Sequence, residues 1–152
     1  MSTGFIIYGI LFFICIAMSP RMDDVYAKTI MWVQTLLIGL FVLEVKGAEV
    51  WVQGLYILTM PAIMVYAYVK KHIAPQDKVL IISSAVFVLL GALFWMLDLP
   101  GAGILQMLAL LSIISLLLLM FKGSNELYNE IGFMFVLAVV SGFMCINYLV
   151  NN

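Results

Sequence analysis

Long apolar stretches separated by short polar breaks make up almost the whole chain. A helix of about 20 residues crosses the roughly 30 Å hydrocarbon layer of a membrane, and the apolar stretches have about that length. They cover residues 4–19, 26–45, 48–69, 78–97, 102–121 and 129–149. Proline or glycine occurs in the breaks, as in Ser19-Pro20 and Pro100-Gly101, and both residues favour turns. The pattern predicts six transmembrane helices joined by short connections.

The apolar stretches favour helices over the strands of a membrane barrel. Such strands alternate polar and apolar residues over about ten positions, whereas residues 108–121 read LALLSIISLLLLMF without that alternation. The composition agrees, because 66% of the residues are apolar and only 10% are charged, against about 25% charged residues in an ordinary soluble domain. We therefore predict an all-α, polytopic membrane protein in which residues 1–152 form a single transmembrane domain.

The basic residues gather on one side of the predicted spans. On the side of the first, third and fifth connections lie Arg21, Lys28, Lys70, Lys71, Lys78 and Lys122. The opposite side has only Lys46. Short loops rich in lysine and arginine stay in the cytoplasm. The bias predicts a multi-pass protein of the cell inner (plasma) membrane with both termini on the outer side.

Charged residues are absent from the middle of every predicted span. The acidic residues, all at span ends or in connections, are Asp23, Asp24, Glu44, Glu49, Asp77, Asp98, Glu126 and Glu130. Ionisable groups at depth mark proton relays and ion pathways, so the pattern argues against such a relay in the midplane. The only histidine is His72, too few for a zinc or haem site built on several ligands. We expect no catalytic residue, no metal and no cofactor in this chain.

Uncharged polar residues do occur at depth in the second and third spans. At 1.5 Å per residue, Gln34 lies roughly 12 Å and Thr59 roughly 15 Å from the inner ends of their spans. We interpret Gln34, Tyr56 and Thr59 as midplane contacts between helices, each worth about 0.6–2 kcal/mol. The alternative interpretation is that they line a polar path or a wall that faces a quinone.

Two further features shape the third span. Pro61 lies at its centre, where a proline removes one helix hydrogen bond and kinks the backbone. The span closes with Lys70, Lys71 and His72, which we interpret as solvated residues at the inner boundary or as a docking site for a neighbouring protein.

Three segments of the chain resemble a known family. They are MWVQTLL (residues 31–37), YILTMPAIMVYAYVKKHI (56–73) and NELYNEIGFMFVLAVVSG (125–142). In the order of their glutamine, proline, basic loop and glycine they are similar to the family of the E subunit of hydrogenase 4. These proteins are membrane subunits of energy-converting nickel-iron hydrogenase and formate hydrogenlyase complexes, and they are partly similar to the K subunit of complex I.

The chain departs from this family at its two ionisable positions. Tyr56 stands at the position of the family's lysine, and Leu137 stands at that of its glutamate. The resemblance therefore implies a non-catalytic accessory subunit of a complex I-like or membrane-bound hydrogenase assembly in the respiratory chain. Its partners would be the bilayer and other membrane subunits that carry ion translocation, with any quinone bound by neighbouring subunits and no nucleic acid. The alternative is a small oligomeric transporter or channel for an uncharged solute, lined by Gln34, Thr59 and Ser112.

Overall fold

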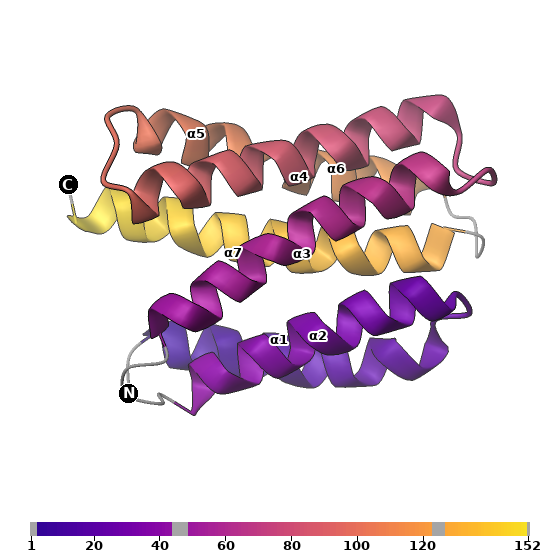
Figure 1. The fold of residues 1–152 in the computed structure, drawn as a ribbon, viewed down its shortest axis with the longest axis horizontal. Coiled ribbons are helices and arrows are strands. Elements are labelled where there is room, and N and C mark those ends of the chain that lie inside the picture. The colour runs from indigo at the N-terminus through magenta and orange to yellow at the C-terminus, as the bar shows by residue number, and fades with distance from the viewer. Residues whose placement is uncertain (1–2, 44–48, 123–126, 152) are drawn as a thin grey trace.

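A computed structural model describes residues 3–43, 49–122 and 127–151, so that Glu44, Lys46 and Glu126 lie outside the described residues. The helices in order are α1 (Thr3–Met18), the short 3-10 helix η1 (Ser19–Arg21), α2 (Val25–Val42), α3 (Glu49–Val69), α4 (Pro75–Met96), α5 (Ala102–Ala109), α6 (Leu111–Lys122) and α7 (Tyr128–Asn151). No strand occurs in the described ranges, and the all-α prediction is confirmed. Figure 1 shows an antiparallel bundle in which α5 and α6 follow one another in a single rod.

The helix boundaries follow from local chemistry at the connections. Asp24 caps α2, because its Oδ1 accepts hydrogen bonds from the backbone N–H groups of Tyr26 (2.9 Å) and Ala27 (3.1 Å), as aspartate commonly does at a helix start. Pro75 is the first residue of α4, where its missing N–H removes no helix bond. Gly101, just before α5, has a φ of 92°, a left-handed conformation that glycine adopts without steric cost.

The predicted span 102–121 is interrupted at Leu110, which separates α5 from α6. There the N–H of Leu110 donates to the carbonyl of Met107 (3.1 Å) and the N–H of Ile113 donates to the carbonyl of Leu110 (2.9 Å). Bonds over three residues tighten the helix locally. The Ser112 hydroxyl also donates to the Ala109 carbonyl (2.7 Å), so a serine that hydropathy treats as part of an apolar run holds this turn.

Helix α7 lies at the centre of the bundle. It packs against α1, α2, α4, α5 and α6, and in Figure 1 it runs between the α1–α2 pair and the α4–α6 group while α3 crosses in front. Phe133 and Leu137 on α7 are fully buried, and the Phe133 ring packs against the Tyr66 ring of α3 in a T-shaped arrangement with 5.3 Å between centroids. The start of α7, the connection 22–24 and the connection 70–74 lie at the same end of the bundle, at the right in Figure 1.

Candidate functional site

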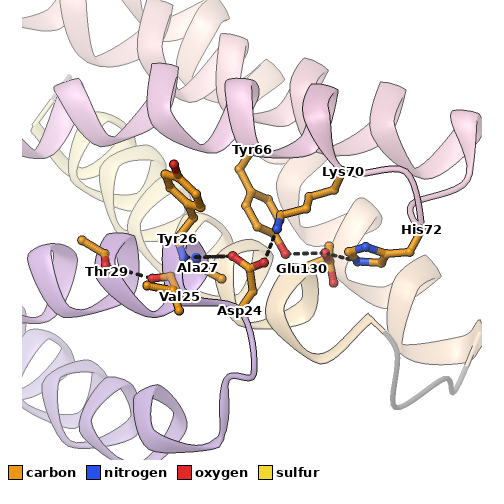
Figure 2. Close-up of polar contacts among 9 residues, drawn as sticks. All are labelled: Asp24, Val25, Tyr26, Ala27, Thr29, Tyr66, Lys70, His72 and Glu130. Atoms are coloured by element: carbon orange, nitrogen blue, oxygen red, sulfur yellow. Dashed lines mark hydrogen bonds and ion pairs between the residues drawn. The ribbon is translucent and has the colours of Figure 1, made fainter.

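The end of the bundle where these segments meet holds a cluster of ionisable side chains, which we name the charged end: Asp24, Tyr66, Lys70, His72 and Glu130. Asp24 comes from the turn before α2, Tyr66 from the last turns of α3, and Glu130 from the first turn of α7. Lys70 and His72 follow α3 directly. Figure 2 shows these side chains in one row, with Glu130 between Tyr66 and His72.

Glu130 is the most enclosed member of the charged end, with an exposed fraction of 0%. Its Oε1 accepts a hydrogen bond from the Tyr66 hydroxyl (3.0 Å) and lies 3.1 Å from Nε2 of His72. Its other oxygen, Oε2, is buried and has no hydrogen-bond partner among the described residues. One oxygen of this buried carboxyl group is therefore hydrogen-bonded and the other is not.

The second contact at the charged end is an ion pair between Lys70 and Asp24. The Lys70 ammonium also lies over two aromatic rings, 5.4 Å from the centre of Tyr66 and 5.9 Å from that of Tyr26, a favourable arrangement for a cation. Partial burial raises the pKa of the Asp24 carboxyl, but hydrogen bonds from Lys70 and from the α2 backbone, with the charge of Lys70, outweigh it and hold the pKa below its usual value. Asp24 therefore carries a negative charge that both caps α2 and ties it to the end of α3.

A second ion pair, between Asp77 and Lys122, joins the start of α4 to the end of α6. Asp77 is buried, whereas the Lys122 side chain is partly exposed. Nearby on α4, Nζ of Lys78 donates to the carbonyl of Tyr68 (2.9 Å). Basic residues that the sequence placed on one side of the spans are thus bound to acidic residues and carbonyls of the same chain.

The neutral polar residues at mid-length form a second kind of contact. Nε2 of Gln34 on α2 donates to Oγ1 of Thr59 on α3 (3.1 Å), and the Thr59 hydroxyl donates to the carbonyl of Tyr56 (2.6 Å). The contact between Gln34 and the third span that the sequence predicts is therefore present, and Thr59 makes it. Tyr56 is buried, and its hydroxyl has no partner among the described residues.

Serine pairs join the helices of the other half of the bundle. The hydroxyls of Ser84 on α4 and Ser115 on α6 are 2.9 Å apart, and those of Ser112 on α6 and Ser141 on α7 are 2.7 Å apart. All four serines are buried. Ser112 therefore pairs with α7, whereas Gln34 and Thr59 pair with one another across α2 and α3.

The remaining predicted residues have mixed outcomes. Pro61 lies inside α3 with an exposed ring, and the kink stays a prediction. Lys71 is exposed, as a docking residue would be. Lys70 and His72, which the sequence interpretation grouped with it, are partly exposed and contact Asp24 and Glu130 of the same chain.

Sequence reasoning missed Glu130, Tyr66 and Asp24 as site residues. In the sequence, Glu130 looks like one of several acidic residues at span ends, and Tyr66 looks like a residue of the inner interface. One signal was available, because the connections that carry the basic residues also carry Asp23, Asp24, Asp77 and Glu130. Opposite charges at one end of a bundle predict ion pairs, although they do not predict which residues pair.

Within the described ranges, no three His, Cys, Asp or Glu side chains come together as a protein metal site would require. Comparison of the chain with protein-family models, with curated proteins and with solved structures gave no significant match.

Proposed function

We propose that the chain is a multi-pass protein of the plasma membrane. Two described segments, the helix Pro75–Met96 and the stretch Ala102–Lys122 that contains α5 and α6, are long and apolar enough to cross a membrane by length and composition. The observation that carries the proposal is the exposure of large apolar side chains at mid-helix on neighbouring elements: Phe13 is 71%, Leu36 65% and Leu58 65% exposed. Soluble monomers rarely expose such extended apolar surface, whereas lipid chains or neighbouring helices would cover it.

Within the membrane, we propose the role of a non-catalytic accessory subunit of a complex I-like or membrane-bound hydrogenase assembly. The support is the neutral chemistry of the bundle middle, where Gln34 meets Thr59 and serines pair across helices. Tyr56 and Leu137, which replace the ionisable positions of the resembled family, are both buried. A phenol and an alkyl chain have no charged state accessible near neutral pH, so ion translocation would belong to the partner subunits.

Co-purification tests this role directly. The tagged full-length chain, extracted in a mild detergent, should bring with it antiporter-like or hydrogenase membrane subunits that mass spectrometry identifies. A chain that purifies alone, remains folded and moves a solute across liposome membranes would contradict the accessory role. That result would favour the transporter alternative, whose one structural support is the pair of buried amide oxygens without partners in the described part, Gln34 Oε1 and Gln106 Oε1.

Orientation is tested by cysteine labelling, for which the chain is well suited because Cys15 and Cys145 are both buried. Ala74 and Pro100 are exposed and belong to the connections before and after α4, and these connections lie at opposite ends of the bundle (Figure 1). A membrane-impermeant reagent added outside intact cells should label Pro100→Cys and not Ala74→Cys. The reverse labelling pattern would overturn the predicted topology.

A further inference from the structure

The described residues form three acid–base contacts, and one of them differs from the others in its basic partner. Asp24 pairs with Lys70 and Asp77 pairs with Lys122, and lysine is normally charged throughout the physiological pH range. Glu130, with no lysine or arginine among its described partners, contacts the imidazole of His72 and the phenol of Tyr66. An imidazole can take up or release a proton close to neutral pH, so the basic partner of Glu130 differs in kind from the lysines of the other two contacts.

Opposing forces act on the charge of Glu130. Complete burial and the unpartnered Oε2 disfavour the carboxylate. The hydrogen bond from the Tyr66 hydroxyl favours it, and so does its position in the first turn of α7, because a helix N-terminus attracts negative charge. A protonated His72 would tip this balance toward the carboxylate, and a neutral one would not.

His72 also provides a route between Glu130 and the solution. It lies in the short connection between α3 and α4, and its side chain is 41% exposed while that of Glu130 is 0% exposed. Figure 2 shows the imidazole reaching Glu130 from this connection, on the side opposite Tyr66. A buried carboxylate with a half-exposed imidazole at 3.1 Å has the geometry for proton exchange by a single transfer, since the two atoms are within hydrogen-bond reach.

We propose that Glu130 is a proton-binding site that exchanges its proton with the solution through His72. In the loading step, the Nε2–H bond of the imidazolium breaks and an O–H bond forms on Oε1 of Glu130. The imidazole is left neutral with its remaining proton on Nδ1, the carboxyl is left neutral, and the reverse step returns the proton. This inference goes beyond the proposed accessory role and holds for the chain whatever assembly contains it.

The other charged groups at this end of the bundle are paired with one another or have no described contact with Glu130. Lys70, which lies over the Tyr66 ring, is paired with Asp24, and the pair contributes little net charge. On the helices that pack around α7, Asp77 of α4 is paired with Lys122 of α6. The further titratable groups of the connections and helix ends here are Arg21, Asp23, Tyr26, Lys28, Tyr68, Lys71, Lys78 and Tyr128. None of these has a described contact with the Glu130 carboxylate.

The first half of the test follows the protonation of His72. Since the chain has a single histidine, its ring signals are assigned without ambiguity. In the full-length protein in lipid nanodiscs, the ring signals of His72 are followed by NMR as the pH is changed. Glu130→Gln should lower the pH at which the ring loses its proton by about 1–3 units, because the carboxylate that favours the imidazolium is gone. Asp23→Asn, which removes an exposed carboxylate at the same end, should leave the His72 titration unchanged.

The other half follows the carboxyl itself by infrared difference spectroscopy. On acidification of the wild-type protein, the C=O bands of protonated carboxylic acids should include a band that Glu130→Gln lacks, and this band belongs to Glu130. In His72→Gln the band should appear about 1–3 pH units higher than in the wild type, whereas Lys71→Gln, a charge removed from the adjacent exposed position, should not move it. This pair of variants decides the question even where Glu130→Gln does not fold.

Two results would overturn the proposal. One is a His72 titration that is identical in the wild type, Glu130→Gln and Asp23→Asn. The other is a carboxylic-acid band that appears at the same pH in His72→Gln and Lys71→Gln. Neither measurement depends on partner subunits, so failure of the proton site and failure of the accessory role are separate outcomes.

Discussion

The charged end and the middle of the bundle join neighbouring helices with different chemistry. At the charged end, α3 is tied to α7 by Tyr66 and Glu130 and to the start of α2 by Lys70 and Asp24. In the middle, α2 meets α3 through Gln34 and Thr59, and serines join α4, α6 and α7. Neutral groups need no counter-charge when they are buried, whereas a buried carboxylate needs one. The ionisable contacts therefore lie where water or a half-exposed partner is within reach.

This comparison also separates two kinds of response. Hydroxyls and amides keep one charge state near neutral pH, so the contacts of the middle should respond to substitution but not to pH. The carboxylates and the imidazole of the charged end should respond to both. The following substitutions test that difference, beginning with the largest expected effect.

Glu130→Leu should give the largest loss of stability. It leaves the buried Tyr66 hydroxyl without its acceptor, which costs about 1–3 kcal/mol of unfolding free energy. Denaturant titration in mixed micelles measures this loss. Adding Tyr66→Phe to the same chain removes the unpaired hydroxyl and should recover part of the stability. A Glu130→Leu protein as stable as the wild type would show that this contact does not hold the charged end together.

Gln34→Leu should have an intermediate effect. It removes the hydrogen bond to Thr59, worth about 1 kcal/mol, and, if the chain has the proposed accessory role, should reduce the amount of assembled complex. Redox turnover and membrane potential, each normalised to assembled complex, should stay near the wild-type values. Val33→Leu, at the exposed neighbouring position, is the matched control. Normal assembly combined with uncoupled ion movement would place Gln34 in a conduction path. The middle of the bundle would then have a role in ion movement and not only in helix packing.

Two adjacent serines of α4 allow a closer test of the middle. Ser84 bonds across to Ser115, whereas the Ser83 hydroxyl donates only to the Leu80 carbonyl of its own helix (3.1 Å). Ser84→Ala should therefore lower the unfolding free energy by about 0.6 kcal/mol, with the same loss at acidic and neutral pH. Ser83→Ala should cost less. Equal losses for both serines would mean that the bond between α4 and α6 contributes nothing of its own.

Asp24→Asn should have the smallest effect at neutral pH, about 0.3 kcal/mol, because the ion pair with Lys70 is partly exposed and asparagine still caps α2. Its pH dependence is the sharper measurement. The pKa of Asp24 is lowered in the folded protein, so its contribution is present above the ordinary pKa of an aspartate and is lost as the pH falls through the folded value.

The wild-type protein should therefore lose stability in this acidic range, and Asp24→Asn should lose less. The exposed Asp23 provides the control, since Asp23→Asn should keep the wild-type pH profile. Parallel profiles for the wild type and Asp24→Asn, measured by unfolding at several acidic pH values, would contradict the lowered pKa.

The sequence by itself determined the helical segments and their approximate ends, because the length of an apolar run and the turn residues beside it are local properties. It also predicted the contact between Gln34 and the third span, since residues at equal depth on consecutive antiparallel helices can meet when their side chains face one another. Asp24 as a helix cap was readable in principle, because a cap bonds only two or three residues away.

Only the tertiary structure decided the interruption at Leu110 and the surroundings of Glu130. Around Leu110, hydrogen bonds over three residues replace the ordinary α-helical bonds over four residues. The same apolar residues could form either kind, so the sequence does not decide between them. Glu130 meets Tyr66 and His72 across separations of 64 and 58 residues. The burial of Glu130 depends on where α3 and the connection after it lie against α7. No local pattern contains that information, because a glutamate in the first turn of a helix looks the same in sequence whether water or an imidazole faces it.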